Sequence, residues 1–172
     1  MNKYTNHILF NGRDKSYNSN AEMSKSEVPR FISQGTFTGK LAIVKEDGGS
    51  HVVPVWFVLD SSNSKGRGTK GNIIFTTCGA SVKANNIRRN NKVSICIDDQ
   101  KPYFSFVTIF GTARIHTYNQ KEVLKWATKI VERYLGKDEA KAYGKRNSTD
   151  GEALVRIRPI KIIAEKDIAR WD

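Results

Sequence analysis

The chain contains a succession of short segments rich in β-branched and aromatic residues, each followed by turn-forming residues, and no other feature limits the possible folds as strongly. Segments of this length and composition form strands, and neighbouring strands joined by short turns pair antiparallel. We therefore predict a mainly β fold with flanking helices, in which the sheet closes on itself or nearly so. The expected strands are residues 41–44, 51–59, 73–77, 92–97, 103–115 and 154–164.

Two prolines and one glycine lie inside these predicted strands. Pro54 has no N–H to donate, so its strand is expected at a sheet edge or with a bulge. A bulge there would leave backbone groups of residues 54–56 free to contact a ligand. Pro159 likewise predicts that the last strand is bent or lies at an edge. Gly111 predicts a bend or bulge within the 103–115 strand.

Capping residues mark the expected helices. Ser26 is predicted to cap a first helix that ends at Gln34-Gly35, and Ser81 to cap a helix after the third strand. Asn119, followed three residues later by a glutamate, predicts the start of a long helix that Gly136 ends. A short helix over residues 137–143 is expected next.

The length of 172 residues suits one domain. Residues 1–23 are polar and rich in asparagine, which predicts a flexible N-terminal arm before a single domain over residues 24–172. Residues 60–71, rich in serine, glycine and lysine, predict a mobile connection. The chain lacks both the roughly 18-residue apolar run of a membrane helix and the apolar centre of a signal peptide. We therefore expect a cytoplasmic protein without a membrane partner.

The formal net charge of +12 favours an anionic partner, which can be nucleic acid, an anionic surface or a small molecule. The lysines and arginines are dispersed, without zinc-finger spacing, a basic heptad region or an aromatic ribonucleoprotein motif. We therefore expect no nucleic-acid partner. Cys78 and Cys96 form no CxxC pair and the three histidines are scattered, so neither a metal site nor a disulfide is predicted. Both thiols are expected to be small buried groups.

One stretch predicts an anion site. The strand over residues 73–77 is followed by a small polar turn and a basic helix that begins after Ser81. This order brings backbone N–H groups, a hydroxyl and the Lys83 ammonium to one helix N-terminus. Such a position binds phosphate, because the first helical turn has unpaired donors and the helix dipole is positive there.

Several segments, in order, resemble one known family. The chain is similar to the pyridoxamine 5′-phosphate oxidase-like split-barrel proteins from about Ser26 to Ile168. Within them it most resembles the group of probable coenzyme F420-dependent enzymes. The segments that carry the resemblance are Gly39–Ala42, His51–Phe57, Thr76–Thr77, Ser81–Lys83 with Asn86, Asp98–Asp99, Pro102–Val107 and Gly111–Ala113.

The resemblance implies a six-stranded antiparallel split β-barrel of the FMN-binding type. It also implies a homodimer with two cofactor sites at the subunit interface. The cofactor would be the deazaflavin coenzyme F420 or, alternatively, FMN. F420 carries an acidic oligoglutamate tail, which a basic surface including Arg88 and Arg89 suits better than FMN does.

The same resemblance implies the cofactor-binding residues. Pro54, Val55 and Trp56 would border the ring. Thr76 and Thr77 would contact the ribityl chain or the phosphate, and Ser81 and Lys83 would bind the phosphate. Asn86 would support that loop, and Lys40 would face the cofactor.

The implied activity is hydride transfer from the cofactor to an organic acceptor such as an enone, a quinone or a tetrapyrrole like biliverdin. The alternatives are an FMN-binding split-barrel oxidoreductase and a non-catalytic flavin or deazaflavin carrier or sensor. No catalytic residue is assigned; water, Tyr103, His51 and Lys40 are the candidate proton sources. The chain ends at Asp172 without the C-terminal region of true pyridoxamine phosphate oxidases, so production of pyridoxal phosphate is not expected.

Overall fold

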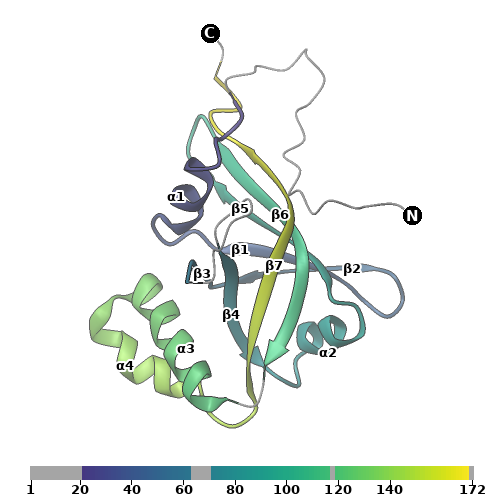
Figure 1. Ribbon diagram of the computed structural model, residues 1–172, viewed down its shortest axis with the longest axis vertical. Coiled ribbons are helices and arrows are strands. Elements are labelled where there is room, and N and C mark those ends of the chain that lie inside the picture. Colours follow the sequence, from purple (N-terminus) through teal and green to yellow (C-terminus); the bar gives the residue numbers. More distant parts are fainter. Residues whose placement is uncertain (1–20, 63–70, 117–118, 171–172) are drawn as a thin grey trace.

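The computed structural model describes residues 21–62, 71–116 and 119–170. Within these ranges seven strands form one antiparallel sheet, with helices on its sides (Figure 1). The strands are β1 (Gly39–Val44), β2 (Ser50–Val55), β3 (Val58–Asp60), β4 (Asn72–Cys78), β5 (Lys92–Asp99), β6 (Ser105–His116) and β7 (Glu152–Glu165). The helices are α1 (Glu27–Ser33), α2 (Val82–Arg89), α3 (Gln120–Leu135) and α4 (Lys137–Arg146).

The order of the strands explains the shape of the sheet. The order is β2-β1-β5-β6-β7-β4-β3, so β2 and β3 form the two edges. Only Trp56 and Phe57 separate these edge strands in the chain. Three Cα–Cα steps span at most about 11 Å, so the ends of β2 and β3 must lie close together. The sheet therefore curls into a barrel that stays split between its two edges.

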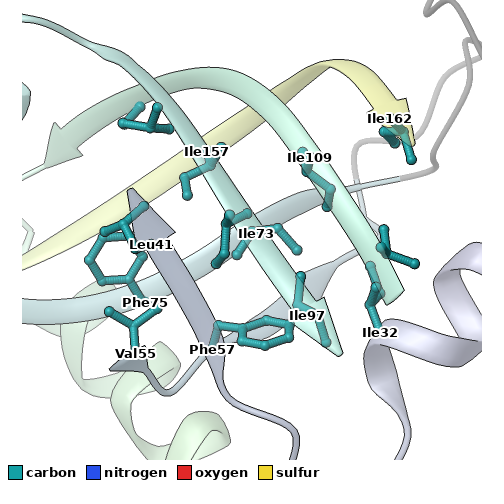
Figure 2. Packing of buried hydrophobic residues seen from close by; sticks show 14 of the residues in the cluster. Ile32, Leu41, Val55, Phe57, Ile73, Phe75, Ile97, Ile109, Ile157 and Ile162 are labelled. Carbon is teal, nitrogen blue, oxygen red and sulfur yellow. The ribbon is translucent and has the colours of Figure 1, made fainter. Parts of the chain in front are cut away.

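The inward-facing side chains form the main core. Fully buried residues from opposite walls point toward one another, and Phe57 from the link between β2 and β3 lies among them (Figure 2). Burying each large aliphatic or aromatic side chain contributes about 1.5–3 kcal/mol. The labelled members are Ile32, Leu41, Val55, Phe57, Ile73, Phe75, Ile97, Ile109, Ile157 and Ile162.

A second, smaller apolar cluster lies between α3 and the outer side of the sheet. Val123 and Trp126 of α3 pack there with Ile74 of β4 and Leu154 of β7. Figure 1 shows α3 and α4 together on one side of the sheet, with α2 on the other side. The barrel thus has a helical hairpin attached beside β3 and β4.

The structure has seven strands rather than the six expected. The predicted 51–59 strand is in fact two strands, because β2 ends at Val55 and β3 begins at Val58. Phe57 is fully buried in the barrel core, and Trp56 stacks on Tyr134 of α3. These two aromatic anchors turn the chain away from β1 and lead it to the opposite edge, where β3 pairs with β4.

The edge position expected from Pro54 is confirmed, because β2 is an edge strand. No bulge interrupts it, since its pairing with β1 runs without a shift from Gly39↔Val55 to Val44↔Ser50. The irregularity predicted at Gly111 is confirmed, because the β6–β7 register shifts between Phe110 and Gly111. Gly111 pairs with Pro159, so β7 accommodates its proline at this bulge and not at an edge.

Three of the predicted helix boundaries are confirmed. Ser81 accepts a hydrogen bond from the backbone N–H of Ala84, Asn119 caps α3, and α3 ends at Gly136. Ser26 precedes α1 but its side chain makes no capping bond. The capping box lies two residues earlier, where Ser24 and Glu27 exchange hydrogen bonds (Glu27 N to Ser24 Oγ 3.3 Å, Ser24 N to Glu27 Oε2 2.8 Å).

The packed domain begins earlier than residue 24. Ala21 and Met23 are buried and pair with the end of β7 (Lys166 N to Ala21 O 2.7 Å, Met23 N to Ala164 O 3.0 Å). The rest of the predicted arm, and residues 63–70 of the predicted mobile connection, lie outside the described residues. No helix in the described ranges is long and apolar enough to cross a bilayer.

Candidate cofactor site

The predicted phosphate corner forms where β4 meets α2. Thr77 is buried, and its hydroxyl oxygen lies 3.2 Å from that of Ser81. Ser81 also accepts from Ala84 N (3.3 Å) and, through its carbonyl oxygen, from Asn85 N (3.0 Å). Within the described residues, the backbone N–H groups of Val82 and Lys83 have no acceptor. The corner therefore combines two fixed hydroxyls with two open donors at a helix N-terminus.

Cationic side chains surround this corner. Lys83 is half-buried and lies close enough to Glu152 to influence that carboxyl. Burial raises the pKa of Glu152, and the Lys83 ammonium acts in the opposite direction. Arg88 donates to the carbonyl oxygen of Gly79 at 2.7 Å and to Asn85 Oδ1 at 3.0 Å, so its guanidinium lies over the turn. This geometry brings Arg88, expected from the sequence in a basic surface, to the corner as a second cation beside Lys83.

Asn86, predicted to support the loop, makes its side-chain hydrogen bonds within α2. Its side-chain amide donates to Val82 O within α2 (2.9 Å) and accepts from Arg89 (3.3 Å). Arg89 donates in turn to Val44 O at the end of β1. Asn86 and Arg89 therefore fix α2 against the barrel and hold the phosphate corner in place.

The predicted ring wall has two different parts. Pro54 and Trp56 are exposed, Trp56 by 41%, whereas the Val55 side chain is buried in the core. Val55 can therefore meet a ligand only through its backbone. The Trp56 indole stacks flat on Tyr134, with ring centroids 4.9 Å apart and an interplanar angle of 4°.

Helix α3 clamps this wall. The Tyr134 hydroxyl donates to Phe37 O (2.7 Å) and accepts from Phe57 N (3.3 Å). Arg133 donates to Phe57 O (2.9 Å) and Ile32 O (2.8 Å), and its guanidinium lies over the Phe57 ring. Burial lowers the pKa of Arg133 and raises that of Tyr134. Neither residue had a local sequence signal, because each acts on backbone groups at least 76 residues away.

Lys40 lies directly opposite Pro54 in the β1–β2 pair. Its ammonium contacts Asp98 Oδ1 at 2.6 Å, so its charge is already paired. The structure therefore brings Lys40 beside the wall and Thr77, Ser81 and Lys83 into the corner.

Three other residues predicted from the sequence, Thr76, His51 and Tyr103, are not brought to the wall or the corner in the same way. Thr76 and Thr77 point to opposite sides of β4, since successive strand residues alternate. By the same alternation His51, three residues before Pro54 in β2, faces the opposite side from it. Tyr103 lies in the turn before β6.

Neither cysteine is fully buried, contrary to the expectation from the sequence. Cys78, next to the corner, is exposed and Cys96 is half-buried. The turn after β4 faces solvent, which is why a residue that ends an apolar strand is accessible. The described residues contain no cluster of histidine, cysteine and acidic side chains that could hold a metal ion.

The donor set fits a phosphate monoester. Open backbone N–H groups, hydroxyls and nearby cations at one helix N-terminus supply directional hydrogen bonds and charge to a phosphate group. The exposed Pro54–Trp56 wall offers an apolar surface to a planar ring. These are the two ends of a flavin-type cofactor.

Comparisons with known proteins identify a family and a shared fold. A family model described as pyridoxamine 5′-phosphate oxidase matches residues 25–164. A conserved hypothetical protein from Mycobacterium tuberculosis is a similar solved structure (25% identity, TM-score 0.73, 89% of this chain and 91% of that chain covered). No curated protein sequence matches the chain.

Two further solved structures share the fold. One is an F420 reductase (22% identity, TM-score 0.55, covering 87% of this chain and 98% of that chain). The other is an FAD-binding protein from Mesorhizobium loti (14% identity, TM-score 0.58, covering 83% and 93%).

Proposed function

The chain belongs to the pyridoxamine 5′-phosphate oxidase family, whose members are flavin-binding oxidoreductases, and on this premise we propose that it binds coenzyme F420 and transfers a hydride to an organic acceptor. The observation that carries the proposal is the phosphate corner. Thr77, Ser81 and Lys83, which the sequence resemblance implied, meet there with open backbone donors. Both F420 and FMN have a phosphate and a planar ring that suit the two parts of the site.

Charge favours F420 over FMN. The acidic tail of F420 would extend from the phosphate corner, where Arg88 adds a cation that FMN would not need. The net charge of +12 has the sign that such a tail requires. FMN is the alternative cofactor, since an F420 reductase and an FAD-binding protein both share this fold.

We further propose that two copies of the chain form the complete site. Strands β1, β2 and β5 have an outer face with small side chains such as Ala42 and Cys96, bordered by Val52, which is 61% exposed. Lys40 and Pro54 lie on this same face. A second copy that covers the face would shield the ring from water.

In the proposed mechanism the chain mainly positions the cofactor and shields its ring from water. The corner would hold the phosphate, and the clamped Pro54–Trp56 wall would fix the plane of the ring. When bound, the reduced cofactor supplies the hydride. The acceptor would be an enone, a quinone or a tetrapyrrole, and its proton would come from water or from Lys40, which lies beside the wall.

Fluorescence titration with F420 and with FMN tests the proposal. We expect micromolar or tighter binding of at least one, and no binding of either would refute it. Lys83→Ala should weaken binding roughly tenfold or more, since it removes a charge-assisted hydrogen bond. Lys92→Ala, an exposed lysine at the start of β5, is the matched control and should leave the affinity unchanged.

A panel of acceptors then separates enzyme from carrier. Oxidation of the reduced cofactor by an enone, a quinone or biliverdin supports the reductase. Tight binding without turnover across the panel would favour the alternative, a flavin or deazaflavin carrier or sensor.

A further inference from the structure

The ion pair between Lys40 and Asp98 lies beside the candidate ring wall. Its Nζ–Oδ1 distance is 2.6 Å, and the two side chains are 34% and 30% exposed. Lys40 is paired with Pro54 in β2 and with Cys96 in β5, and Asp98 follows Cys96 by two residues. Because strand residues two apart share a face, Lys40, Pro54 and Asp98 all point to the outer side of the sheet.

This pair has unused hydrogen-bonding capacity. An ammonium group has three donors, and Lys40 uses two of them, on Asp98 Oδ1 and on Thr38 O (3.4 Å). Among the described residues, the other oxygen of Asp98, Oδ2, accepts no hydrogen bond. One N–H donor and one carboxylate oxygen therefore stand side by side at the surface.

A neighbouring donor and acceptor match a particular kind of ligand edge. The pyrimidinedione ring of flavins and deazaflavins presents an N3–H group next to a carbonyl oxygen. A carboxylate can accept from that N–H while an ammonium donates to the carbonyl. Paired with Asp98, Lys40 is less suited to a phosphate, whose charge needs an uncompensated cation.

We propose that Asp98 and Lys40 together bind this pyrimidine edge, with Asp98 accepting from N3–H and Lys40 donating to the adjacent carbonyl oxygen. The assignment rests on the proposed function and makes Asp98 a cofactor-binding residue. It also gives Lys40 a defined role at the ring. Since F420 and FMN share this edge, the pair would recognise either cofactor.

The test compares FMN with 3-methyl-FMN, in which a methyl group replaces the N3 hydrogen. The wild-type protein should bind FMN about ten- to hundredfold more tightly, because hydrogen bonds to charged groups have this strength. In Asp98→Ala the two ligands should bind with nearly equal affinity. Lys40→Met should weaken both by a similar factor, since both ligands keep the carbonyl.

The matched control is a second pair of the same residue types. Lys45 and Asp47 contact each other at 2.8 Å at the tip of the β1–β2 hairpin, at the other end of β1 from Lys40. Asp47→Ala should keep the full preference for FMN. If Asp98→Ala does not fold, Asp98→Asn serves instead, because its amide cannot reproduce the charged acceptor.

Equal binding of FMN and 3-methyl-FMN by the wild type would overturn the assignment. So would a preference that survives in Asp98→Ala. If the protein binds F420 but not FMN, the same comparison uses F420 and its 3-methyl derivative. If neither cofactor binds, the proposed function itself fails and the assignment fails with it.

Discussion

Removing one hydroxyl from α3 should loosen the wall of the candidate site. Tyr134 uses its hydroxyl to join two segments, donating to Phe37 O at 2.7 Å and accepting from Phe57 N at 3.3 Å. Tyr134→Phe deletes both bonds but keeps the ring that stacks on Trp56. Each bond contributes about 0.5–1.5 kcal/mol, and the longer one belongs at the low end. We expect a loss of about 1–2 kcal/mol in the free energy of unfolding.

Urea denaturation measures this loss, and a second substitution separates the two roles of the residue. Tyr134→Leu also removes the stacked ring, which should cost about 1 kcal/mol more. Tyr143→Phe is the control, because Tyr143 lies on α4 and its hydroxyl has no hydrogen-bond partner in the described residues. If Tyr134→Phe is as stable as the wild type, the hydroxyl does not clamp the wall. Cofactor affinity should fall with the stability of the clamp, more in Tyr134→Leu than in Tyr134→Phe.

Three further predictions concern the sheet. Arg156→Met should destabilise the protein by about 3 kcal/mol in thermal or urea unfolding, because it leaves the buried Asp60 carboxylate, 3% exposed, without its ion-pair partner. Burial disfavours the charged form of Asp60, but hydrogen bonds from Ser62 and Arg156 outweigh it and lower its pKa below the usual 3.8. Because its pKa is lowered, the ionised Asp60 carboxylate stabilises the fold at pH values above the ordinary pKa of the group. This contribution should disappear as the pH falls through the folded-state pKa, and Asp60→Asn should flatten that part of the pH–stability curve. Gly111→Ala should cost about 1–3 kcal/mol in the same unfolding assay, because a Cβ there would lie 2.5 Å from Arg158 O.

Local sequence signals were sufficient for most of the fold. Runs of β-branched and aromatic residues identified β4, β5 and β6, and capping residues identified the starts of α2 and α3. These signals work because burial on one face and unpaired helix N–H groups are decided by residues close in the chain. The family match over residues 25–164 confirmed the resemblance read from the sequence.

The sequence could not separate β2 from β3. Residues 51–59 form a continuous β-branched and aromatic run, and such a run looks the same whether it continues or crosses to another edge. The break depends on the Trp56 stack with Tyr134, 78 positions further along the chain, and on burial of Phe57. Contacts over such separations leave no local pattern.

The site shows the same limit. Thr77, Ser81 and Lys83 lie within seven residues of one another. Their clustering could therefore be predicted from a strand that is followed directly by a helix. Asp98 was not assigned as a site residue, for a different reason. Asp98 meets Lys40 across the β1–β5 strand pair, 58 positions apart in the chain. Register between distant strands decides such contacts, and it follows from the assembled sheet.

Ser81 offers a way to separate folding from binding at the phosphate corner. Its hydroxyl both caps α2 and lies beside Thr77, so Ser81→Ala would change helix stability and phosphate affinity together. Ser81→Asp keeps a side-chain acceptor for the Ala84 N–H and places a negative charge at the positive end of the helix, which is favourable. The same charge repels a phosphate. We therefore expect Ser81→Asp to unfold at the wild-type urea concentration or higher, while its affinity for F420 and FMN falls at least tenfold. Unchanged cofactor affinity in this folded variant would mean that the phosphate lies elsewhere.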